Sequence, residues 1–155
     1  MFLNILILTR VRSGCGNAWL IRSHPALGVG LDGFAAAFDR YLPETPSIIS
    51  DIGTGRGSHN ILLNVQSELG VVGSALFLVF IGITLRSGLV AVANWRRAGS
   101  LHSAGLALTA WLSLVAMLVM GLFLDLQYWK LFWMLLALPE VMRRLSGEAL
   151  LETPA

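Results

Sequence analysis

The chain has 155 residues, of which 55% are hydrophobic and only 13% are charged, whereas soluble domains carry about 25% charged residues. This composition excludes an ordinary soluble domain and a disordered chain, and the single cysteine, Cys15, excludes a disulfide scaffold and a cysteine-rich zinc site. The eleven basic residues are scattered and leave a formal net charge of +2, so there is no basic stripe for nucleic acid, and we expect an all-α membrane protein.

The N-terminal part of the chain differs from the rest. Residues 1–8 (MFLNILIL) are too short to cross a membrane and have no basic residue before them, so they resemble the end of a partial transmembrane helix. Residues 9–68 form an extracytoplasmic loop region with short helices. We expect helices at 17–23 and 32–42, the second with an apolar face, and a glycine-rich turn between them. Ser58 is the expected N-cap of the helix that follows.

Residues 69–142 contain three predicted transmembrane helices, at about 69–95, 103–124 and 126–142, since a crossing needs about 20 apolar residues. Pro139 is expected to end or kink the third. Small residues in the first two, which would serve helix packing, are Gly70, Gly73, Ser74 and Gly105.

The arginine pairs predict the orientation in the membrane. Arg96-Arg97 and Arg143-Arg144 flank the ends that would face the cytoplasm under the positive-inside rule. Residues 143–155 are then a short, frayed cytoplasmic tail. The loop region before residue 69 faces outside.

The densest polar group in the sequence is Arg56-Gly-Ser-His59-Asn60, just before the first predicted crossing. His59 could act as a general base beside an arginine that binds an anion, and Asn60 and Gln66 would share its side of the helix, opposite Ile61 and Val65. The alternative is a capped, solvated helix start that contains an incidental histidine.

Other candidate residues are less distinctive. Glu68 lies at the predicted membrane edge, where it could pair with a loop arginine or extend toward the interface. Residues 24–30 fit a plain turn better than a nucleotide loop. No set of His, Cys, Asp and Glu has metal-ligand spacing, so we expect neither a metal nor another cofactor.

Three stretches resemble the O-antigen ligase family, which includes O-antigen polymerases and exopolysaccharide-production proteins. Residues 24–34 (HPALGVGLDGF) resemble the entry to its large outer loop. Residues 58–82 (SHNILLNVQSELGVVGSALFLVFIG) resemble its His-Asn helix, and residues 130–138 (KLFWMLLAL) resemble its last spanning helix. The matches follow the family's order and correspond to the C-terminal third of a typical member.

The resemblance implies a multi-pass, metal-independent glycosyltransferase in the bacterial cytoplasmic (inner) membrane. It would move a glycan from undecaprenyl diphosphate to an extracytoplasmic acceptor in lipopolysaccharide or exopolysaccharide assembly. His59 would be the catalytic base, supported by Asn60 and Glu68. The family usually has an arginine where this chain has Cys15, so diphosphate binding would depend on Arg56, Arg12 or Arg22.

The expected partners are the lipid-linked oligosaccharide donor, a glycan or lipid acceptor and membrane lipids. Three crossings are too few to enclose a lipid carrier, so we expect this part to be incomplete without an N-terminal half. The alternative is a small, non-catalytic membrane subunit or scaffold protein, in which the small residues of the spans serve helix packing.

Overall fold

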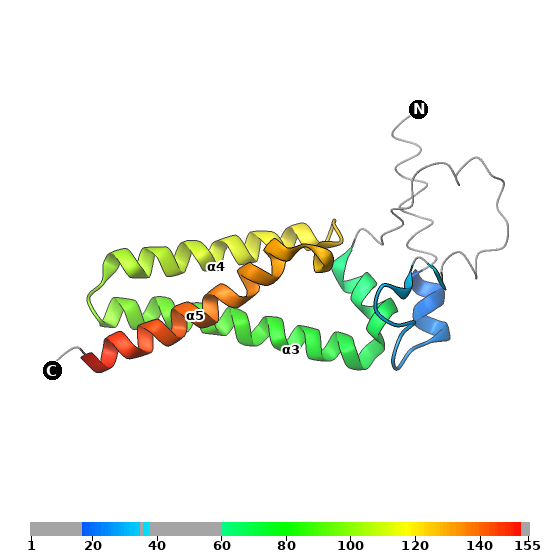
Figure 1. Ribbon diagram of the computed structural model, residues 1–155, viewed down its shortest axis with the longest axis horizontal. Coiled ribbons are helices and arrows are strands. Elements are labelled where there is room, and N and C mark those ends of the chain that lie inside the picture. Colours follow the sequence, from blue (N-terminus) through cyan, green and yellow to red (C-terminus); the bar gives the residue numbers. More distant parts are fainter. Residues whose placement is uncertain (1–16, 35, 38–59, 153–155) are drawn as a thin grey trace, which may run out of the picture. The chain divides into compact units, whose positions relative to one another are not determined.

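The computed structural model describes residues 17–34, 36–37 and 60–152, and all regular structure in these ranges is helical. The long elements are α3 (Ile61–Arg97), α4 (Leu101–Gly121), the short 3₁₀ turn η1 (Leu126–Tyr128) and α5 (Lys130–Glu152) (Figure 1). Predictions that concern residues 1–8, Arg12, Arg56, His59 and the last three residues lie outside the described residues.

The chain divides into two compact units, and each is described by itself. The first comprises described residues within Met1–Leu76 and Gly121–Asp125, and the second comprises those within Phe77–Met120 and Leu126–Ala155. The first unit therefore contains the start of α3, and the second contains the rest of α3 with α4 and α5.

In the first unit, residues 17–23 form the short helix that the sequence predicts. Its last turn is closed by the amide of His24, which donates to the carbonyl of Leu20 at 2.9 Å. Leu20 and Phe34 form a small buried cluster, against which Val29 and Ala37 pack. The predicted turn between the two short helices is present, with positive φ at Gly28 and Gly30.

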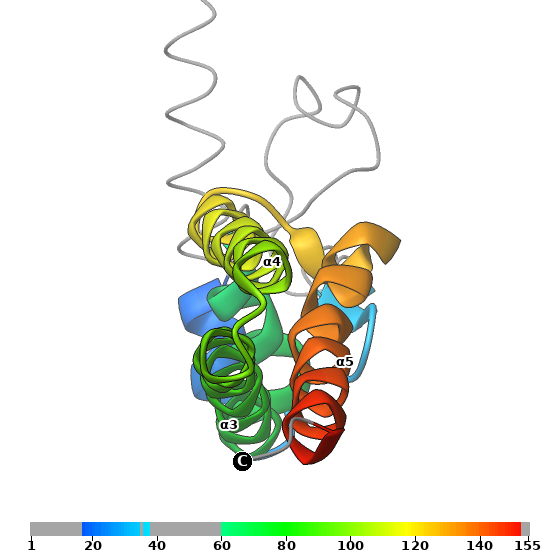
Figure 2. The same ribbon diagram turned by 90° about the vertical axis from the view of Figure 1, so that its left-hand side faces the viewer.

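The second unit is built from three helices that pack through small residues. Ala91 and Val92 of α3 cluster with Ala107 of α4. Figure 2, viewed along the helices, shows α4 and α5 on different sides of α3. Gly88 makes this close approach possible, because a Cβ there would overlap the ring of Trp111 and touch Pro139. Gly105, which the sequence analysis selected for packing, has open space around it instead.

Two helices, α3 and α4, are long and apolar enough to cross a membrane. Both carry large apolar side chains on exposed faces, including Leu76, Ile83 and Leu112. The predicted third crossing, residues 126–142, covers η1 and the first part of α5, and α5 is not one of these two helices. Tyr128 and Trp129, which precede α5, are half exposed. Trp133 closes this turn by donating from its indole nitrogen to the carbonyl of Gln127 at 2.7 Å.

One prediction for the C-terminal part is wrong, because residues 143–152 are not frayed but continue α5 to Glu152. Of the two effects expected of Pro139, ending the helix is contradicted, since Pro139 lies inside α5. Proline removes one helical hydrogen bond, but Pro139 is fully buried and packs beside Gly88. Beyond it, contacts from Glu140 to Arg143 and Arg144 link successive turns, which supports the helix.

Candidate functional site: the break in α3

The main irregularity of the first unit is a break inside α3 at Gly70. This residue has φ 65° and ψ −166°, a region of backbone conformation that is open essentially to glycine alone. The helix therefore consists of a short first segment, residues 61–69, and a long apolar segment that begins at Val71. Figure 1 shows the change of direction near the teal end of α3.

The carbonyl groups left by the break accept hydrogen bonds from the 24–30 turn. In an unbroken helix the carbonyls of Ser67 and Glu68 would accept from amides four residues later. Here the Val29 amide donates to Ser67 at 3.0 Å, and the Gly30 amide donates to Glu68 at 2.9 Å. The turn thus closes the C-terminal end of the short segment.

The amide groups left by the break donate to the same turn. The amides of Val71 and Val72 are the ones that an unbroken helix would direct at Ser67 and Glu68. They donate to the carbonyls of Pro25 at 2.9 Å and Ala26 at 3.4 Å. The turn therefore satisfies all four groups that the break separates, as buried backbone groups require.

Two glycines allow the turn and the break to approach so closely. A Cβ at Gly28, which has φ 66°, would overlap the backbone of Glu68 and the amide of Gly70. A Cβ at Gly70 would in turn overlap the backbone of Ala26. Each glycine contacts the other's segment, so the docked arrangement tolerates a side chain at neither position.

The first segment of α3 buries a face that is partly polar. Ile61, Asn64, Val65 and Glu68 recur at helical spacing and are at most 4% exposed. Ile61 and Val65 are thus buried while Gln66 on the predicted polar side is only partly buried, and the buried face also includes the polar side chains of Asn64 and Glu68. Glu68 is only 2% exposed, which contradicts its interpretation as a side chain extended to the membrane interface.

Asn60 caps α3. Its side-chain oxygen accepts hydrogen bonds from the amides of Leu62 at 2.9 Å and Leu63 at 3.2 Å. These are the N2 and N3 amides of a helix that begins at Ile61, which is the usual geometry of an asparagine N-cap. The predicted cap at Ser58 is corrected to Asn60. Asn60, predicted to support His59, thus lies at the start of α3 as its cap.

The remaining predicted site residues are not brought together among the described residues. Arg22 is exposed on the 17–23 helix. His59, Arg56 and Arg12 lie outside the described residues. What the structure does bring together is the 24–30 turn and the break in α3. From the sequence pattern the first is expected to be a plain turn, and Gly70 a residue for helix packing.

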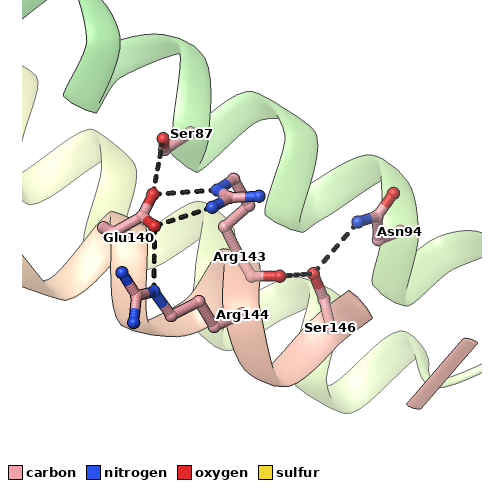
Figure 3. A network of polar contacts seen from close by, with 6 residues as sticks. All are labelled: Ser87, Asn94, Glu140, Arg143, Arg144 and Ser146. Carbon is pink, nitrogen blue, oxygen red and sulfur yellow. Dashed lines mark hydrogen bonds and ion pairs between the residues drawn. The ribbon is translucent and has the colours of Figure 1, made fainter. Parts of the chain in front are cut away.

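A second polar cluster lies in the other unit, between α3 and α5 (Figure 3). Ser87 donates to one Glu140 oxygen at 2.9 Å, and Arg143 binds both oxygens at 2.7 and 2.8 Å. Arg144 adds a contact at 3.1 Å. Hydrogen bonding to Glu140 and its charge raise the pKa of Arg143, which lies beyond the third predicted crossing. Sequence analysis did not identify this cluster.

The same cluster continues toward the C-terminus through Ser146. The fully buried Ser146 hydroxyl accepts from the Asn94 amide at 3.2 Å and donates to the Arg143 carbonyl at 2.7 Å. Ser87 and Asn94 are seven residues apart, and Arg143 is three residues from both Glu140 and Ser146; these helical spacings were the signal that could have indicated two facing polar stripes. The hydrogen bonds from Ser87 and Asn94 to Glu140 and Ser146 hold α5 against α3.

Within the described residues, no group of three or more His, Cys, Asp and Glu side chains could hold a metal ion. Comparisons of the chain with family models, curated proteins and solved structures found no match. The chain is thus characterised by its helices, two of which could span a membrane, and by the docking of the 24–30 turn on α3.

Proposed function

We propose that this chain is the C-terminal part of an O-antigen ligase-like glycosyltransferase. It would transfer a glycan from undecaprenyl diphosphate to an acceptor outside the bacterial cytoplasmic membrane. The proposal rests on the resemblance of residues 24–34, 58–82 and 130–138 to that family. One structural observation supports it: the first two of these stretches, far apart in the sequence, contact each other through four backbone hydrogen bonds.

This contact favours a functional site over a simple linker, because it fixes the first segment of α3 in place. The helix begins at Ile61, with Asn60 as its cap. Its first segment buries Glu68 and ends where the 24–30 turn docks. An outer loop that served only as a linker would not need four backbone hydrogen bonds to the start of α3.

The chemistry assigned to the site follows the resemblance. His59 would accept the proton of the acceptor hydroxyl as that oxygen attacks the first sugar of the donor. The lipid diphosphate would leave as an anion stabilised by the arginines of the loop region, Arg56, Arg12 or Arg22. The donor is already activated by its diphosphate bond, so the step requires neither a nucleotide nor a metal.

The membrane assignment is supported by composition and by exposure. Two helices are long and apolar enough to cross, and their large apolar side chains are exposed along their length. Such faces suit lipid or further spanning helices. In this proposal α5 supplies a third crossing, and the arginine pairs near the ends of α3 and α5 face the cytoplasm. His59 is then outside.

The test is glycan transfer in membranes that lack their own ligase. The chain would be expressed alone and together with the N-terminal helices of a full-length O-antigen ligase, each as the native protein and as His59→Ala. His102→Ala is the matched control, because His102 is an exposed histidine on α4. We expect transfer in the paired sample with native His59 or with His102→Ala, and a loss of at least about a hundredfold with His59→Ala.

Two results would count against the proposal. Equal transfer by native and His59→Ala samples would remove His59 from the chemistry. Absence of transfer in every sample, with the chain shown to be inserted and helical, would favour the small non-catalytic subunit instead.

A further inference from the structure

We infer that α3 is a two-state element whose break is held open by the 24–30 turn. In the docked state the helix is interrupted at Gly70, and in the released state residues 61–97 would form one continuous helix. The inference depends on backbone contacts alone and is independent of the transfer reaction proposed above.

The two states use the same backbone groups of α3. With the turn docked, the carbonyls of Ser67 and Glu68 and the amides of Val71 and Val72 all bond to the turn. When the turn leaves, these four groups are in sequence register to bond to one another, Val71 to Ser67 and Val72 to Glu68. The helix therefore loses no hydrogen bonds in either state, whereas the four groups of the turn keep theirs only in the docked state. The docked state is thus the favoured one, and release requires a ligand or chain that binds the turn instead.

The docked state requires glycine at position 70. Gly70 adopts φ 65° and ψ −166°, a conformation that is readily accessible to glycine and unfavourable for every other residue. The remaining turns of α3 are regular, and the segment beyond Gly70 is strongly apolar. Nothing else in the local sequence, such as a proline, breaks the helix here. The turn is therefore what maintains the break.

Release would change the surroundings of the helix start. In the docked state the segment 61–69 runs in a different direction from the apolar segment after Gly70 (Figure 1). A continuous helix would realign residues 61–69 with the residues that follow Gly70. A ligand or chain that displaces residues 24–30 would thus reorient the start of α3.

The experiment measures amide hydrogen exchange at Val29, Gly30, Val71 and Val72 by NMR, with the full chain in detergent micelles. Four proteins are compared: native, Gly70→Ala, Gly28→Ala and the double variant. Both substitutions remove the docked state, one through the helix and the other through the turn. Gly82→Ala is the control, since it lies in the same helix with open space around it.

The switch predicts an asymmetric result. In each single variant, protection of the Val29 and Gly30 amides should fall by about tenfold or more, while Val71 and Val72 stay protected by their new helical bonds. The double variant should resemble either single one, because both release the same contact, and Gly82→Ala should match the native protein. Loss of protection at all four amides would mean local unfolding and would overturn the inference, as would unchanged exchange at Val29 and Gly30.

Discussion

Each of the two units is stabilised internally by a different kind of contact. At the break in α3 the contacts join backbone to backbone, and the residues that matter are glycines. Among α3, α4 and α5 the contacts join side chains: Trp111 bonds to the carbonyl of Leu85 at 3.0 Å, and Glu140 bonds to Ser87. The first kind of contact depends on the absence of a side chain, whereas the second depends on its identity.

This difference has a consequence for tolerance to substitution. A backbone contact cannot move away from an added Cβ without moving the chain, so the break should accept almost no change. A side chain such as the Trp111 ring can shift by a few tenths of an ångström, so the helix packing should respond by degrees. Four substitutions test this contrast, and they are given from the largest expected effect to the smallest.

Gly70→Ala should be the most damaging. Alanine at this φ and ψ costs about 1–3 kcal/mol, and its Cβ would also overlap the backbone of Ala26. We expect the free energy of unfolding to fall by about 3 kcal/mol. Reversible unfolding by SDS titration, followed by circular dichroism, measures it. A loss no larger than that of Gly82→Ala would show that the break is not glycine-dependent.

Gly88→Ala should have an intermediate effect. Its Cβ would overlap the edge of the Trp111 ring and contact Pro139, and such overpacking typically costs about 1–3 kcal/mol. The same titration applies. The matched control is again Gly82→Ala, whose gain in helix propensity should leave stability equal or slightly higher. If both alanines behave alike, α3, α4 and α5 do not pack at Gly88.

Asn60→Ala should cost about 1 kcal/mol through loss of the N-cap. Asn60→Asp or Asn60→Ser should restore most of the loss, because both side chains can accept hydrogen bonds from Leu62 and Leu63. Stability and glycan transfer are measured on the same variants. If Asp and Ser recover stability but not transfer, Asn60 has a role beyond capping.

Glu140→Gln should have the smallest effect. The ion pairs of Glu140 are about one-third to three-quarters exposed at the side chains involved, and such pairs contribute little. We expect global stability to change little, while residues 143–152 exchange their amide hydrogens faster. Ser87→Ala, which removes one neutral partner, is the milder comparison. Unchanged exchange in Glu140→Gln would mean that α5 continues past Pro139 without help from the ion pairs.

The sequence was a good guide to the long helices and a poor guide to their interruptions. Runs of apolar residues without charges predict α3 and α4, because helix formation is dominated by local spacing and by burial of apolar surface. The effect of Pro139 on α5 could not be predicted from the local sequence, since it depends on Gly88 of another helix. The N-cap moved from Ser58 to Asn60, within the usual uncertainty of helix boundaries.

The candidate site could be predicted from the local sequence even less than the ends of the helices. Gly28 and Gly70 are visible in the sequence, but nothing local indicates that each makes room for the other's backbone. Glu68 looks like a residue for the membrane interface until the turn and helix enclose it. Only a contact between distant segments distinguishes these possibilities, and a single sequence does not encode it in its spacing.

By itself, the sequence determined the helical class, two apolar helices long enough to cross a membrane, and the short helix and turn before α3, because these depend on residues close together along the chain. Tertiary structure alone decided that α3 breaks at Gly70, that Glu68 is buried and that α5 continues past Pro139. Each of these depends on which distant segment supplies the missing hydrogen bond or leaves room for the backbone.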